Sequence, residues 1–194
     1  MDLQVDWEPG IGDPGFMGWF TVFAYFATAV LCGLACRAIR DGIPEPERGR
    51  QPDVWRWVTV FLVALGINKQ LDLQSLFTAL ARALLRKTDL MPVHRTLQFD
   101  FIVALIACAA LFLVVSAWRV RRRRREYWLL LLGITFTTTF IVVRASSFHH
   151  VDVLLGSRVL GAKLNWVFEL TGIALIAAAA WTRRTYARRV RAAA

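Results

Sequence analysis

The chain has 194 residues, of which 57% are hydrophobic and 20% charged, and its formal net charge is +10. Its apolar residues are gathered into long uninterrupted blocks, which argues against an ordinary soluble domain and is typical of a chain that crosses a bilayer. The arginines cluster directly beside these blocks, at 119–125 and 183–191. This placement indicates that the arginines set the membrane topology and contact anionic lipid headgroups, rather than bind nucleic acid.

The first predicted element is a transmembrane helix over residues 16–38. Phe16 to Cys36 carries no charge, and a hydrocarbon core about 30 Å thick needs about 20 helical residues. Acidic residues precede this block, where a cleavable secretory signal would have basic ones, so we expect the helix to be retained. The segment 41–53 contains three prolines and is predicted to be an irregular linker.

The second predicted span, residues 54–75, is the least regular one. Its charge-free core, Trp57 to Ile67, is about half the length that a bilayer requires. The positive-inside rule still favours a crossing here, because only then do the linker, the arginine block and the basic tail all face the cytoplasm. Arg56 and Lys69 would extend toward opposite membrane faces, keeping their charges in water.

Beyond Lys69, apolar residues at helical spacing predict an amphipathic helix over about 71–87 on the outer face. Three further spans are predicted over residues 100–119, 127–147 and 163–182. Most tryptophans fall near span ends, where indole rings prefer to lie. The predicted fold is therefore an all-α polytopic membrane helix bundle in a single domain, residues 1–194. It has five transmembrane helices, an amino terminus outside and a cytoplasmic carboxyl terminus.

This topology brings three polar segments to the outer side: LGINKQLDLQ at 65–74, RASSFHHVD at 144–152 and NWVFELTGI at 165–173. We predict a binding patch there, formed by Asn68, Lys69, Asp72, Arg144, Ser146, Asn165 and Glu169. A carboxylate inside a span is costly unless it is paired, protonated or hydrated. Glu169 is therefore either a register-fixing partner of Arg144 or a ligand, proton or catalytic group. Lys69 and Asp72, three residues apart, could pair with each other.

A second candidate set consists of possible metal ligands. Carboxylate and imidazole side chains suit zinc, and the set comprises His149, His150, Asp152 and Glu169. Asp152 could orient the imidazole of His149 if the helix continues. Adjacent helical residues point about 100° apart, so both histidines bind one metal only where the backbone is irregular or where other segments supply ligands. The alternatives are a pair of interfacial histidines bonded to headgroups or neighbouring groups, and a role such as proton transfer.

The segments LGINKQLDLQ, SSFHHVD and NWVFEL resemble a group of small bacterial multi-pass inner-membrane proteins without a characterised activity. The resemblance covers most of the chain and implies a location in the bacterial inner membrane. A second resemblance is to alkaline-ceramidase-like intramembrane hydrolases. It rests on Ser146 and His150 as a Ser-x-x-x-His element, with Asp72 as the acid. That family's later His-x-x-x-His element is missing here, and the family has seven spans.

Three functions follow as hypotheses, and a haem or quinone role is a further alternative. The first is an accessory or partner-binding subunit, joined to another protein or to a second copy, in which Glu169 is tightly paired. The second is a membrane-embedded, metal-assisted hydrolase or transferase acting on a lipid-linked substrate, with three converging ligands and one open position. The third is a small proton-coupled transporter, with a polar channel continuing inward past Glu169 along the threonines of the fourth span.

Overall fold

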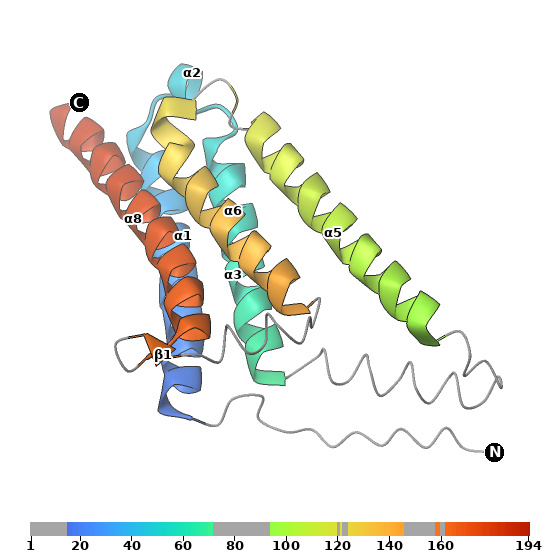
Figure 1. The fold of residues 1–194 in the computed structure, drawn as a ribbon. Helices are drawn as coiled ribbons and strands as arrows, with labels where there is room; N and C mark the ends of the chain where they lie inside the picture. The colour runs from blue at the N-terminus through green and yellow to red at the C-terminus, as the bar shows by residue number, and fades with distance from the viewer. Residues whose placement is uncertain (1–14, 72–93, 120, 122–123, 146–157, 160–161) are drawn as a thin grey trace, which may run out of the picture.

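The computed structural model describes residues 15–71, 94–119, 121, 124–145, 158–159 and 162–194. These residues are almost entirely helical, which confirms the predicted fold class at that level (Figure 1). The helices are α1 Phe16–Gly42, α2 Glu45–Arg48, α3 Gln51–Leu71, α5 His94–Arg119, α6 Arg124–Ala145 and α8 Leu164–Ala193. Two short strands, β1 Arg158–Val159 and β2 Ala162–Lys163, pair antiparallel immediately before α8.

The five long helices run in alternating directions along the bundle (Figure 1). The amino ends of α1, α5 and α8 lie at the same end as the carboxyl ends of α3 and α6. Helix α1 packs against both α3 and α8, and α8 also packs against α6. Helix α5 lies at the edge, contacts α6 less extensively and diverges from it toward its own amino end.

The segment 41–53 is more ordered than predicted, because its prolines lie where helices tolerate them. Helix α1 continues to Gly42, α2 forms a short helix, and α3 begins at Gln51. Pro46 and Pro52 occupy the first turns of α2 and α3, where the missing N–H has no intrahelical acceptor to lose. Gly49, with φ of 47°, forms the turn between the two helices.

Several helices differ in length from the predicted spans. Helix α5 already begins at His94, six residues before the predicted span, and α3 begins at Gln51, three residues before its own. Helix α8 continues well beyond residue 182, because arginine and alanine favour helix and its end packs on α1. At that contact, a Cβ added to Gly42 would lie 2.3 Å from the carbonyl oxygen of Ala187. The predicted amphipathic helix at 71–87 lies outside the described residues, apart from Leu71.

The core lies between α1, α3, α6 and α8. Its most buried apolar side chains include Ile39, Leu62, Leu130 and Ile176. Helices α6 and α8 approach each other closely at glycines: a Cβ at Gly133 would lie 2.8 Å from Ile176, and one at Gly172 only 2.3 Å from the Thr137 hydroxyl oxygen. Small residues at such crossings are a common device of helix packing in membranes.

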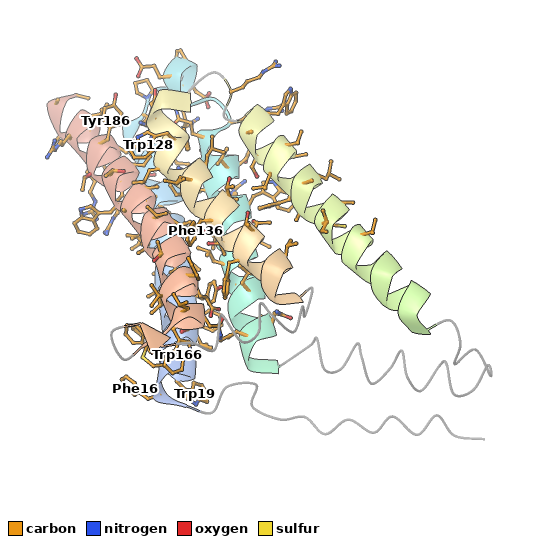
Figure 2. All side chains as sticks on the ribbon, in the orientation of Figure 1. Phe16, Trp19, Trp128, Phe136, Trp166 and Tyr186 are labelled. Carbon is orange, nitrogen blue, oxygen red and sulfur yellow. The ribbon has the colours of Figure 1, made fainter. Side chains whose placement is uncertain are left out.

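The outer faces of the long helices carry large apolar side chains. The most exposed include Phe16, Phe23, Val30, Val60, Leu111, Val114 and Trp181. In Figure 2, Phe16, Trp19 and Trp166 lie toward one end of the bundle, and Trp128 and Tyr186 toward the other. By length and composition, α1 and α8 could each cross a membrane, and shorter apolar helical stretches occupy Ile106–Trp118 and Glu126–Val142. These features support a membrane location.

Candidate functional site

A buried ion pair joins α3 to α8 near one end of the bundle. The Lys69 ammonium nitrogen lies 2.8 Å from Oε2 of Glu169, and the two side chains are only 6% and 4% exposed. The Tyr25 hydroxyl, from α1, donates a hydrogen bond of 3.1 Å to Oε1 of the same carboxylate. Three helices that are distant in sequence therefore meet at one carboxylate. We call Tyr25, Lys69 and Glu169 the carboxylate cluster.

The local sequence explains how these side chains reach each other. Lys69 lies in the last turn of α3, and Glu169 lies in the second turn of α8, so the antiparallel helices bring both to the same end. Gly66, one turn before Lys69, permits a close approach of α3 to α1. A Cβ at that position would lie 3.1 Å from the ring of Phe26 and 3.3 Å from the Cβ of Tyr25.

The electrostatics of the cluster favour a closed, structural arrangement. Removing a carboxylate from water is costly, and the cost is offset only when a counter-charge and further hydrogen bonds are supplied in good geometry. Glu169 has both, because Lys69 binds one oxygen and Tyr25 the other. Charge-assisted hydrogen bonds of this kind are the strong ones in proteins. The sequence already indicated that burying the Glu169 carboxylate costs free energy. The ion pair with Lys69 offsets most of this cost.

The other residues of the predicted patch are described in part. Asn68 is exposed on α3. Asn165 lies in the first turn of α8, and its buried Oδ1 has no hydrogen-bond partner among the described residues. Arg144 lies on α6, but its side chain is outside the described part of the chain, so an Arg144–Glu169 contact stays a prediction. Asp72 and Ser146 also lie outside it, as does the suggested Lys69–Asp72 pair.

Sequence reasoning missed Tyr25. The residue lies in a charge-free span and was counted with the apolar side chains. One signal was present: Tyr25 is the single tyrosine in the block from Phe16 to Cys36, and a buried phenol usually finds a hydrogen-bond partner.

A second polar cluster lies toward the opposite end of the bundle, between α3, α6 and α8. The Arg183 guanidinium donates to Gln51 Oε1, with an Nε distance of 3.1 Å, and its Nη2 lies 3.0 Å from Glu126 Oε2. The Tyr127 hydroxyl also donates to Gln51 Oε1, at 3.1 Å. We call Gln51, Glu126, Tyr127 and Arg183 the guanidinium cluster. The sequence had placed Arg183 in the topogenic tail and gave no sign of this role.

An apolar layer separates the two clusters. Leu62, Ile134 and Ile176, from three different helices, are between 0% and 2% exposed. Between this layer and the carboxylate cluster, the hydroxyls of Thr137 and Thr138 are buried without a hydrogen-bond partner in the described residues. Thr137 packs against Gly172, one turn along α8 from Glu169.

The candidate zinc ligands cannot be assembled from the described residues. Within these, no three His, Cys, Asp or Glu side chains converge. His149, His150 and Asp152 lie outside the described residues and stay predictions. Glu169, the fourth candidate, is engaged by Lys69 and Tyr25, so a metal ion there would have to displace an ammonium group.

The carboxylate cluster can therefore hold three helices in register, and its chemistry is that of a neutralised ion pair. The guanidinium cluster does the same at the other end, with a neutral amide at its centre. No family model, curated protein or solved structure matches the chain.

Proposed function

We propose that the protein is an integral protein of the bacterial inner membrane that serves as an accessory or partner-binding subunit. It crosses the bilayer five times, with the amino terminus outside and the carboxyl terminus in the cytoplasm. The observation that carries the proposal is the closed contact of Tyr25, Lys69 and Glu169. The carboxylate cluster contains charges that are costly to bury, and it joins three helices. Such a fixed arrangement of helices is what a rigid membrane scaffold requires.

The alternating directions of α1, α3, α5, α6 and α8 support five crossings. Helix α3 has 21 residues and is therefore roughly 31 Å long, about the thickness of the hydrocarbon core. Arg37 and Arg40 near the end of α1, Arg121 and the basic tail of α8 then share one side of the membrane. The positive-inside rule makes that side cytoplasmic.

The metal-assisted hydrolase receives less support. Its mechanism needs three ligands and an open coordination position for water. Glu169 is the one predicted ligand with a described side chain, and both of its oxygens already accept hydrogen bonds. The accessory role is compatible with the Lys69–Glu169 pair as it stands, because no side chain has to be displaced.

One observation favours the proton-coupled transporter: Thr137 continues the polar groups one turn inward from Glu169. Beyond Thr137, however, the apolar layer of Leu62, Ile134 and Ile176 fills the interior. A proton pathway needs polar side chains or water through that layer. The helix-fixing role is therefore the better supported one.

The topology is tested by thiol labelling in intact cells. In a variant whose three native cysteines, Cys32, Cys36 and Cys108, are replaced by alanine, a single cysteine is introduced at Asn68 or at Arg188, both of which are exposed. A membrane-impermeant maleimide should label Asn68→Cys from the periplasm, and Arg188→Cys only after lysis. The reverse pattern, or labelling of both from one side, would contradict the proposed topology.

The accessory role is tested by particle size. After solubilisation in a mild detergent, the chain at its natural level should migrate on a native gel as a larger complex than the same chain produced in excess. Co-purification of two differently tagged copies distinguishes a second copy from a different protein. Identical migration at both levels, at the size of one 22.0 kDa chain in its micelle, would contradict the role.

A further inference from the structure

Helix α5 leaves a lateral cavity of about 370 Å³ between itself, α3 and α6. This volume falls in the range of about 300–1,000 Å³ that is usual for ligand pockets. The lining is almost wholly apolar and includes Val58 of α3, Leu111, Phe112 and Val115 of α5, and Leu131 and Ile134 of α6. Stacking of Phe61 on Phe112, with ring centres 4.7 Å apart, holds α5 to α3 beside the cavity.

A second hollow, of about 530 Å³, adjoins this cavity at the end of the bundle that carries the arginines. It is lined by Arg50, Asp53, Val54, Arg56, Trp57 and Val60. Val54 and Trp57 line both spaces and form the junction between them. One continuous surface thus has a basic end at Arg50 and the first turns of α3, and an apolar end that extends between α3, α5 and α6.

The charges of the basic end suit a phosphate group. Arg50 and Arg56 provide two guanidinium groups, and Asp53 lies 3.3 Å from Arg56, so one net positive charge is left over. Guanidinium groups bind phosphate oxygens in a bidentate manner. Trp57 is 56% exposed, and an indole at this level is typical of the headgroup region.

We propose that this surface binds an anionic phospholipid of the cytoplasmic leaflet. Its phosphate would lie at Arg50 and Arg56, and one acyl chain would fill the cavity between α3, α5 and α6. The orientation rests on the function proposed above, because the arginine-bearing end must face the cytoplasm, where anionic lipids attract basic groups. The lipid would fill the space between α5 and its neighbours and so stabilise α5, which is the least closely packed of the five long helices.

Cys108 provides a probe of the cavity. It is exposed and lines the apolar end, whereas Cys32 and Cys36 are buried in the core. In delipidated protein in detergent, we expect dioleoyl phosphatidylglycerol to slow alkylation of Cys108 by N-ethylmaleimide. At a lipid concentration of about three times its Kd, the rate should fall about fourfold. Dioleoyl phosphatidylcholine, with the same acyl chains, should protect much less.

Substitutions test both ends of the site. The Arg50→Gln, Arg56→Gln double variant should lose the difference between the two lipids. The matched control Arg188→Gln, Arg189→Gln, which removes two exposed arginines outside both hollows, should keep it. Ser116→Phe, which fills the apolar cavity, should reduce the phosphatidylglycerol that native mass spectrometry finds on the protein.

Equal protection by both lipids, or loss of the difference in the control variant as well, would overturn the proposal. Detergent phase partitioning of the same preparations separates this outcome from failure of the proposed function. A chain that enters the detergent phase but shows no lipid preference refutes the lipid site alone. A chain that stays in the aqueous phase refutes the membrane assignment and the lipid site together.

Discussion

The two buried polar clusters lie toward opposite ends of the same bundle and are built on different principles. In the carboxylate cluster, a full negative charge faces a full positive charge, and the two side chains are only 4% and 6% exposed. In the guanidinium cluster, Arg183 shares the neutral amide oxygen of Gln51 with Tyr127. Its carboxylate, Glu126, is 38% exposed and can be hydrated.

This difference indicates at which cluster a substitution should lower the stability of the bundle more. If one partner of a fully buried ion pair is removed, the other is left as an uncompensated charge in a medium of low dielectric constant. If one partner of a partly hydrated network is removed, water can take its place. We therefore expect the carboxylate cluster to tolerate substitution less well than the guanidinium cluster.

The largest effect is expected for Lys69→Met. It leaves the Glu169 carboxylate buried without its cation and should lower the free energy of unfolding by about 3–5 kcal/mol. Arg183→Met, at the other end, should cost about 1–3 kcal/mol, because Gln51 is neutral and Glu126 reaches water. Denaturant unfolding in micelles, followed by circular dichroism, measures both. Equal losses would remove the distinction between the clusters.

Two tyrosines offer a closely matched comparison. Tyr25→Phe removes a hydrogen bond to a charged acceptor and should cost about 1.5–3 kcal/mol. Tyr127→Phe removes a bond to a neutral amide and should cost about 0.5–1.5 kcal/mol. The same unfolding measurement applies to both variants. A larger loss for Tyr127→Phe than for Tyr25→Phe would reverse the expected order.

The region between the clusters is tested by glycine substitution. In Gly172→Ala, the added Cβ would meet the Thr137 hydroxyl at 2.3 Å and must separate α6 from α8, at a cost of about 1–3 kcal/mol. Gly33→Ala is the control, because nothing lies within 4 Å of the added Cβ there. Its helix should be as stable or slightly more stable, since alanine favours helix over glycine. Thermal melting of the two variants should separate them clearly.

The smallest effect is expected for Thr137→Val. The Thr137 hydroxyl is buried without a hydrogen-bond partner in the described residues, so an apolar group of the same shape should change stability by less than about 0.5 kcal/mol. A loss of 2 kcal/mol or more, a threshold on the order of a full buried hydrogen bond, would show that the hydroxyl has a partner such as water. That outcome would strengthen the transporter hypothesis.

The sequence predicted the helical fold and several helix starts well. Charge-free blocks such as Phe16 to Cys36 locate membrane helices directly, because the bilayer selects for length and apolarity. The same reasoning was too cautious about the linker at 41–53 and the tail of α8. Both contain more helix than predicted, and packing such as that of Gly42 against Ala187, which hydropathy cannot register, contributes to this.

The sequence predicted which candidate residues share one end of the bundle, but not which of them pair. Charge parity predicted that Lys69 and Glu169 lie at the same end of the bundle, as they do, yet it could not predict which helices are neighbours. That choice depends on close approaches such as Gly66 of α3 against α1. Tyr25 and Arg183 were missed because each had a simpler explanation, as an apolar core residue and as a topogenic charge. The roles of His149, His150 and Asp152 stay predictions.

The most direct test of the central claim is a double-mutant cycle on the ion pair, measured as unfolding free energy of the protein in micelles. Lys69→Met leaves a buried charge behind, and Glu169→Gln removes that charge while keeping an acceptor for Tyr25. We expect Lys69→Met, Glu169→Gln to be more stable than Lys69→Met alone, with a coupling free energy of about 0.5–3 kcal/mol. If the double variant instead loses the sum of the two single losses, the pair does not hold α3 to α8.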